Sequence, residues 1–339
     1  SDEDIYYDLL SELEAAYGQF DESKKGWVEG DNIYNGDVAK WKKFANSLRL
    51  RIAMRMRGAD QTTADEHINA IISSGDYFTS NADNAVFQYE TNSDNASPMY
   101  RAYVVSARTD FALTNTFVDL LKGDRGPFGI FDPRLKRFGA PKGVKPWAAS
   151  INPADYTADD YVGAPYGVEN SVASTIEFAD ISLPYYPLKP DYGEVFMDAA
   201  EVQFIISEFN GWSQTEYEQG VRLSMEKWGV TQAEIDDYIA NLPAANQENV
   251  LTQKYIALYM QPYQAWAEYR RTGFPTHLLK PGETITDPLA GEYTFEPLKQ
   301  EVGSDLPARV GFSEEEELLN PNGFESGKTK LGGPNDMST

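Results

Sequence analysis

The residues that could do chemistry in this chain are acidic side chains and aromatic rings, because the other reactive types are scarce. The 339 residues include 53 Asp and Glu, two histidines and no cysteine. The lack of cysteine excludes a thiolate nucleophile, a disulfide and a Cys-ligated zinc. His67 and His277 are too isolated to make up a zinc site or a Ser-His-Asp triad. The glycine motifs that bind nucleotide phosphates do not occur.

The carboxylates leave two kinds of chemistry open. An Asp/Glu pair could catalyse glycoside hydrolysis, but Asp159-Asp160 and the acidic run 314–317 are typical of solvated surface. Asp83 and Asp94, with their Asn neighbours, resemble parts of calcium loops without the EF-hand order. We therefore expect no cofactor, with calcium as an open alternative.

Aromatic residues make up 13% of the chain, including 21 tyrosines. Such rings form flat platforms for sugars or bases. The net charge of -24 argues against nucleic acid, because phosphate binding needs a basic surface. It also disfavours docking on anionic lipid. An acidic chain rich in tyrosine therefore favours a neutral sugar or a peptide as ligand.

Helices must position these groups. Apolar residues at helical spacing predict helices over 4–17, 37–57, 107–121, 196–209, 247–272 and 313–319. Capping boxes predict further helix starts at Thr63, Ser213 and Thr231, and Asp132-Pro133 predicts another. Residues 85–89 could form a strand. No apolar run approaches the roughly 20 residues that span a bilayer.

Two helical stretches combine rings with positive charge. The helix at 37–57 carries seven basic residues and no acid from position 40 onward, so we expect it to pair with the chain's own carboxylates rather than with nucleic acid. Pro262 should kink or break the helix that ends at Gly273. Trp266 and Arg271 lie before that end, where a packed ring beside a salt-bridged arginine is the main interpretation and ligand contact the alternative.

Residues 139–193 show little periodicity and are rich in glycine, proline and aromatic rings. A loop this long in a compact chain is usually functional or disordered, and the rings favour an ordered one. The tail from Asn320 is expected to be irregular.

Several stretches together resemble the SusD/RagB family of nutrient-binding outer-membrane lipoproteins of Bacteroidetes, closest to its SusD-like subgroup. They follow the family's order and cover nearly all of the chain. The matching stretches are 34–37 with 40–52, 132–135, 200–204 with 210–212, 253–259 with 265–275, and 307–309 with 314–320.

The resemblance implies a predominantly α fold, with tetratricopeptide-like helix pairs in an α-α superhelix and long irregular loops. It implies one SusD-like domain over 1–339 that is not catalytic. That domain would bind an oligosaccharide, or else a peptide, at the outer membrane for a SusC-type TonB-dependent transporter. Family members are usually longer at the N-terminus and begin with a lipidated cysteine. The resemblance therefore implies that the early helices and the lipid anchor, which is the expected membrane contact, are absent from this chain.

Ligand choice in this family lies in variable loops, which makes 139–193 the expected ligand-binding insertion. The stacking residues that we expect there are Trp147, Tyr156, Tyr161 and Tyr166, and Tyr100 is a further candidate. Two other functions stay open. One is a helical glycoside hydrolase with an Asp/Glu pair, and the other is a helical-repeat scaffold that binds only protein.

Overall fold

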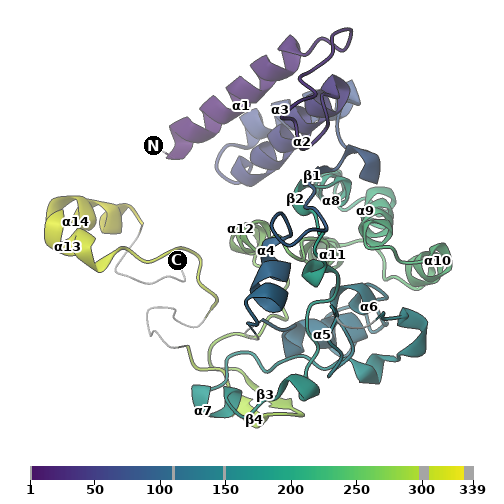
Figure 1. Cartoon of the computed structure of the whole chain (residues 1–339). Helices are drawn as coiled ribbons and strands as arrows, with labels where there is room; N and C mark the ends of the chain where they lie inside the picture. Colours follow the sequence, from purple (N-terminus) through teal and green to yellow (C-terminus); the bar gives the residue numbers. More distant parts are fainter. Residues whose placement is uncertain (1, 109–110, 148–149, 298–304, 332–339) are drawn as a thin grey trace.

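The computed structural model describes residues 2–108, 111–147, 150–297 and 305–331, and over these the chain is predominantly helical (Figure 1). The longer helices are α1 (Asp2–Gln19), α2 (Val38–Met56), α3 (Gln61–Ser74), α8 (Ala199–Phe209), α9 (Gln214–Lys227), α10 (Gln232–Ala240), α11 (Gln247–Ala257) and α12 (Pro262–Thr272). The shorter helices are α4 (Pro98–Tyr100), α5 (Asn115–Lys122), α6 (Leu135–Phe138), α7 (Asn170–Ala173), α13 (Glu314–Leu319) and α14 (Pro321–Lys330).

The long helices pack as successive pairs. Helix α2 lies against α1 and α3, and α8 lies against α9 and α11. Helix α2 also contacts α8, which joins the two sets. Leu50, Phe204 and Val250 from three of these helices are completely buried in one apolar cluster. The expected superhelix of tetratricopeptide-like pairs with long irregular loops is confirmed.

Two small antiparallel sheets accompany the helices. Strands β1 (Ala85–Phe87) and β2 (Glu194–Met197) pair with Val86 opposite Val195. Strands β3 (Thr284–Asp287) and β4 (Gly291–Thr294) form a hairpin at the end of the molecule farthest from α1 (Figure 1). The β1–β2 pair brings the loops after residue 87 and before residue 194 together.

Several local predictions are confirmed. Thr231 and Glu234 form the expected capping box at the start of α10. Pro262 breaks the long helical pattern into α11 and α12, and it occupies the first turn of α12. Gly273 ends α12 with a φ of 73°, a conformation that glycine adopts without steric cost.

Four helix boundaries differ from the predictions. The third helix begins at Gln61 because Asp60, not Thr63, accepts the capping hydrogen bond. Helix α5 begins at Asn115 rather than near 107, because the amides at 113 and 115 bond to loop carbonyls. The segment at 194–197 is strand β2, so the helix after it starts at 199. The helix that was predicted to start at Asp132-Pro133 begins at Leu135 instead, since the Asp132 carboxylate forms an ion pair with Arg134.

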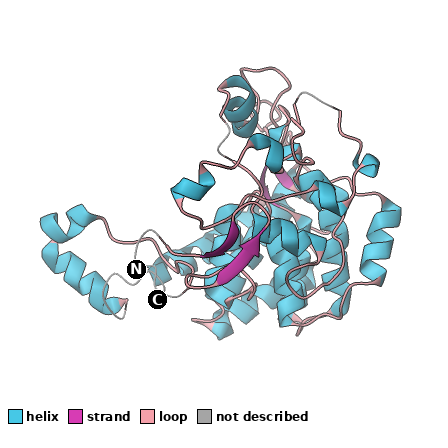
Figure 2. Cartoon of the chain, turned by 90° about the horizontal axis from the view of Figure 1, so that it is seen from below, coloured by secondary structure: helices cyan, strands magenta, loops and turns pink. Residues whose placement is uncertain are grey.

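The segment after Asn320 was expected to be irregular; this prediction is wrong for residues 321–330, and residues 332–339 lie outside the described residues. Asn320 caps α14 by accepting a hydrogen bond from the amide of Gly323 at 3.2 Å, and Pro321 sets the first turn. The rings of Phe312 and Phe324 hold α14 to the preceding segment, with 5.3 Å between their centroids. Helices α13 and α14 stand apart from the rest of the chain in both Figure 1 and Figure 2.

Among the residues that the structure describes, none of the helices is both long and apolar enough to cross a membrane.

Candidate functional site

Three neighbouring hollows lie beside β1, and we call them together the groove. The first hollow has a volume of about 720 Å³, the central hollow about 710 Å³, and the third, which we call the lysine hollow, about 340 Å³. The first and central hollows share Asn32 and Phe87 as lining residues, and the central and lysine hollows share Gln88. All three volumes fall in the range typical of ligand sites.

The first hollow is built by the glycine-rich loop before α2. Trp27 lies in this loop with 88% of its surface exposed, and its ring is a wall of the hollow. Asp31 shapes the loop by accepting hydrogen bonds from the amides of Tyr34 and Gly36 and from the indole of Trp41 at 2.7 to 3.0 Å. Burial opposes ionisation of Asp31, but these donors outweigh it and hold its pKa at about 2. The loop is therefore fixed before any ligand arrives.

The central hollow places two rings beside polar side chains. Phe87 and Tyr89 meet edge to face with 5.2 Å between ring centroids. Arg101 lines the same hollow, and its guanidinium has no hydrogen bond or ion pair within the described residues. The loop at the rim is tied down by Ser97, whose amide donates to the carbonyl of Pro190 at 2.8 Å. The arrangement offers a stacking surface and free hydrogen-bonding groups together.

The lysine hollow is walled by aromatic rings and lysines. The rings of Tyr192 and Trp228 stack with 6.1 Å between centroids and 25° between planes, and Tyr186 meets Trp228 edge on. Lys189 and Lys227 also line this hollow. Residues 186–193 belong to the segment 139–193, so that segment does supply one end of the groove.

Two of the rings predicted from the sequence to contact ligand lie outside the groove. Trp147 is half-buried against Tyr103, with 6.0 Å between ring centroids. Tyr166 is 38% exposed, but its ring packs on Phe295 at 5.2 Å, and its carbonyl accepts a hydrogen bond from Tyr293. Both rings pack against other segments of the chain in this structure.

The other predicted rings are also separate from the groove. Tyr161 is completely buried, so it offers no face to a ligand. Tyr156 is half-buried against the same apolar cluster as Tyr161, and these are the two predicted rings that the structure brings together. Tyr100 ends α4 as a half-buried side chain and lies next to the central hollow in sequence without lining it. Residues 148–149 of the predicted insertion lie outside the described residues.

Sequence reasoning missed Trp27, Tyr89 and Trp228. The sequence context of Trp27 indicates an exposed ring, because a tryptophan in a glycine-rich loop does not belong to the apolar face of a helix. The sequence around Tyr89 and Trp228 gives no such indication, because these residues follow a strand and a helix in patterns that are typical of buried side chains.

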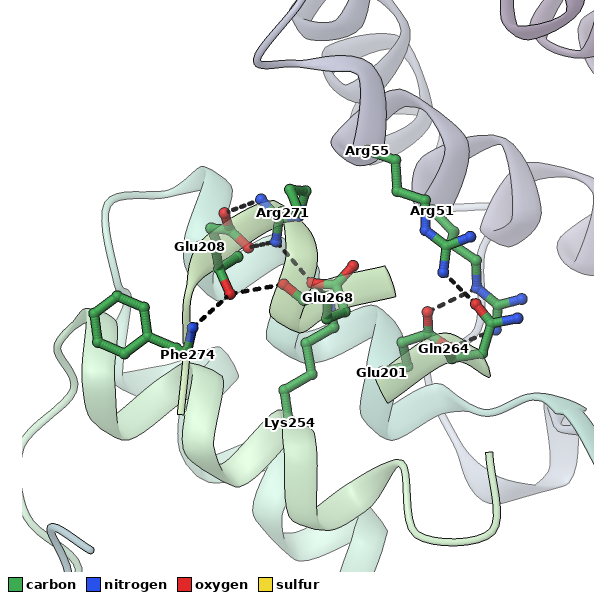
Figure 3. A network of polar contacts seen from close by, with 10 residues as sticks. Arg51, Arg55, Glu201, Glu208, Lys254, Gln264, Glu268, Arg271 and Phe274 are labelled. Atoms are coloured by element: carbon green, nitrogen blue, oxygen red, sulfur yellow. Dashed lines mark hydrogen bonds and ion pairs between the residues drawn. The ribbon is translucent and has the colours of Figure 1, made fainter. Parts of the chain in front are cut away.

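The ring-and-arginine stretches instead hold the fold (Figure 3). Arg271 pairs with Glu208 and Glu268 at 2.7 Å each, as the main sequence interpretation predicted. Lys254 of α11 reaches Glu268 at 2.8 Å. Arg51 of α2 pairs with Glu201 of α8 at 2.5 Å. These pairs tie α2, α8, α11 and α12 together. Most other basic residues of this stretch of α2 also pair with the chain's own carboxylates, whereas Arg55 bonds the side-chain amide of Gln264.

Other reactive residues do not gather into a site. His67 accepts a hydrogen bond from Arg49 at 2.8 Å, and His277 is buried on another segment, which lowers its pKa to about 4. Asp83 forms an ion pair with Lys43 and accepts hydrogen bonds from two backbone amides. Within the described ranges, no group of three His, Cys, Asp or Glu side chains is placed to hold a metal ion. Burial raises the pKa of Asp119 and Glu194, which lie outside the groove.

Comparison with known proteins identifies the family of this chain. A profile described as "Starch-binding associating with outer membrane" matches residues 1–289, and one described as "Susd and RagB outer membrane lipoprotein" matches residues 241–339. No curated protein is significantly similar to the chain.

Solved structures agree with these matches. A SusD homolog from Bacteroides uniformis is 25% identical with a TM-score of 0.75, and the alignment covers 100% of this chain and 72% of the other. A SusD homolog from Parabacteroides distasonis is also 25% identical, with a TM-score of 0.74 and coverage of 100% and 73%. A structure described as a chitin-binding protein is 25% identical with a TM-score of 0.73, covering 99% and 71%. The chain therefore belongs to the SusD/RagB family of outer-membrane lipoproteins.

Proposed function

We propose that this protein is a non-catalytic glycan-binding component of the outer cell surface, and that it holds an oligosaccharide in the groove. The observation that carries the proposal is the series of rings along three adjoining hollows, with Trp27 at one end, Tyr89 in the centre, and Tyr192, backed by the buried Trp228, at the other. Sugar rings present apolar faces that pack on aromatic surfaces, while their hydroxyls need polar partners such as Asn32 and Gln88.

The comparisons support a glycan as the ligand. The family description mentions starch binding, and one similar structure is described as a chitin-binding protein. The pre-formed loop around Asp31 also supports binding, because a fixed site loses less conformational entropy when the ligand arrives.

A proposed partner follows from the family. We propose that the bound glycan passes to a SusC-type TonB-dependent transporter in the same membrane. The test is purification of the protein from native outer membranes followed by mass spectrometry. A stoichiometric TonB-dependent transporter is the expected result, and recovery of the protein alone would overturn this part of the proposal.

The groove itself is tested with two alanine variants, Trp27→Ala and Tyr89→Ala. Stacking of a ring on an aromatic side chain contributes ~1–3 kcal/mol by analogy with nucleic-acid bases, so each variant should weaken glycan binding about tenfold. Isothermal titration with starch, chitin and cellulose oligosaccharides measures the affinity. Trp27 is highly exposed, so its replacement should leave the fold intact.

Matched controls are Trp147→Ala and Tyr166→Ala, which remove rings of the same kind outside the groove. They also test the sequence-based assignment of residues 139–193, which remains a proposal for these positions. We expect affinities within about twofold of the unmodified protein. A large loss in the controls without loss in the groove variants would move the site to the 147–166 loops.

A further inference from the structure

Two cations beside the lysine hollow have no carboxylate partner among the residues that the structure describes. The Lys189 ammonium lies 3.8 Å from the centroid of the Tyr186 ring and 5.0 Å from that of Tyr185, and it makes no hydrogen bond or ion pair there. Arg137 is only 9% exposed, and its Nε donates to the carbonyl of Gly229 at 3.1 Å. Positive charge therefore collects at this corner of a chain whose net charge is -24.

Several other buried or half-buried cations in the described chain are neutralised by carboxylates at short range. Such pairs are Arg51–Glu201, Arg134–Asp132, Lys254–Glu268 and Arg271–Glu208, with N–O distances of 2.5 to 2.8 Å. The chain holds 53 acidic residues, so carboxylates are abundant. Lys189 and Arg137 differ from these pairs, because neither forms an ion pair with a carboxylate among the described residues.

The Lys189 ammonium is unfavourably placed in the free protein. Burial lowers the pKa of Lys189 below its ordinary value, the Asp191 carboxylate acts in the opposite direction, and the Arg137 guanidinium lowers it further. A partly desolvated cation without a counter-charge gains free energy when an anion reaches it. The rings of Tyr185 and Tyr186 compensate only part of this loss through cation–π attraction.

The hollow in front of Lys189 has the shape for a sugar ring. Its volume is about 340 Å³, and the stacked pair of Tyr192 and Trp228 gives it an aromatic wall. Lys227 stands at the same hollow, where one of its three N–H donors is occupied by Asp198 at 2.5 Å. Asp198 neutralises Lys227, so Lys189 is the lysine of this hollow that remains available to pair with an anionic ring substituent.

We propose that the lysine hollow is a subsite for an anionic sugar unit, whose carboxylate or sulfate group pairs with Lys189 while the ring lies against the aromatic wall. This inference rests on the proposed glycan-binding function and specifies the chemistry of one end of the groove. Asp191 also lines the hollow, so the subsite accepts one anionic group rather than a cluster. The acidic surface likewise opposes a densely charged polyanion.

The test compares the unmodified protein with Lys189→Met and Lys189→Arg on an array of neutral, uronate-bearing and sulfated oligosaccharides. We expect the protein to prefer a uronate-bearing or sulfated glycan over its neutral counterpart. Lys189→Met should lose about tenfold or more in affinity for that glycan, the scale of a lost charge-assisted hydrogen bond. Lys189→Arg should recover part of the loss, and the neutral glycan should be unaffected by either change.

The outcomes separate the inference from the function on which it rests. Binding of neutral glycans only, unchanged in Lys189→Met, overturns the anionic subsite and leaves the glycan-binding function standing. Equal loss for neutral and anionic glycans also overturns it, because Lys189 would then act on the sugar ring alone. Binding to no glycan overturns both. For the preferred glycan, raising the salt concentration from 0.05 to about 0.5 M should weaken binding, because salt screens the exposed side of the pair.

Discussion

The helical core and the lysine hollow both contain positively charged side chains that are shielded from water, but the two regions differ in the groups that surround this charge. In the core, Lys254 and Arg271 each meet the carboxylate of Glu268 within 2.8 Å, and Arg271 meets Glu208 as well (Figure 3). At the lysine hollow, Lys189 faces tyrosine rings and Arg137 faces a backbone carbonyl. The same residue types are neutralised in one region and left without a carboxylate in the other.

This difference separates charge that holds the fold from charge that is available to a ligand. A buried pair is weak evidence of net stabilisation, yet removing one partner is costly because the other is left unpaired. The pairs Arg51–Glu201 and Arg271–Glu208 join helices that are far apart in sequence, so they help specify which helices meet. The cations at the lysine hollow join nothing comparable, and their missing partner is what the ligand would supply.

The largest effect is expected when the core loses a carboxylate. Glu268→Gln leaves Lys254, which is 1% exposed, without its ion pair. The free energy of unfolding should fall by ~3–5 kcal/mol, as measured by urea denaturation at pH 7. Asp236→Asn, which breaks the exposed pair with Arg222, is the matched control and should change little. A small effect of Glu268→Gln would mean that the core pairs do not hold the helices together.

Lowering the pH should decrease the free energy of unfolding by a comparable amount, because it protonates Glu268. Burial opposes ionisation of Glu268, but Lys254 and Arg271 outweigh it and lower its pKa from 4.5 to about 2. Since the folded-state pKa is the lower one, the stabilisation is complete above about pH 4.5 and is lost as the pH falls towards 2. The loss is roughly 3 kcal/mol.

The measurement for this prediction is the difference in unfolding free energy between the unmodified protein and Glu268→Gln from pH 7 to pH 2.5. That difference should shrink below pH 4.5. The buried His277, with a pKa lowered to about 4, titrates mainly between pH 6.5 and 4 and is common to both proteins, so it cancels. A difference that stays constant down to pH 2.5 would contradict the assigned pairing.

The smallest effect on stability is expected at the lysine hollow. Lys189→Met removes a cation that has no ion-pair partner among the described residues, so the cation–π contacts with Tyr185 and Tyr186 are lost, and relief from desolvation offsets this loss. The free energy of unfolding without ligand should stay within about 1 kcal/mol of the unmodified protein. Urea denaturation of the two proteins side by side measures this. A loss of several kcal/mol would place Lys189 among the residues that hold the fold and would remove the contrast between the two regions.

Local signals in the sequence were enough for most of the helical architecture. The apolar spacing in 37–57 and the capping residue Thr231 act within one or two turns, so the sequence shows them directly. The errors had both distant and local causes. Helix α5 starts late because the chain before it bonds to residues some 50 to 70 positions onward, and α14 forms on a segment with no clear apolar stripe.

The sequence by itself determined most of the helices, the break at Pro262, and the pairing of the basic helix with the chain's own carboxylates, whereas the helix pairs were implied by the family resemblance. Composition also set the acidic, ring-rich character that favours a sugar ligand. It could not say which rings face a ligand. Tyr161 and Trp27 lie in similar irregular segments, yet one is completely buried and the other is 88% exposed.

Only the tertiary structure decided the site. The groove takes its walls from residues 20–41, 86–106 and 186–195 and from Trp228, and the pairing of β1 with β2 brings the second and third of these segments together. Whether a ring is a platform or part of the core depends on what covers it, and the covering residues are far away in sequence. The same reason left Lys189 unremarkable in the sequence, because a cation becomes a binding group only where folding places no carboxylate beside it.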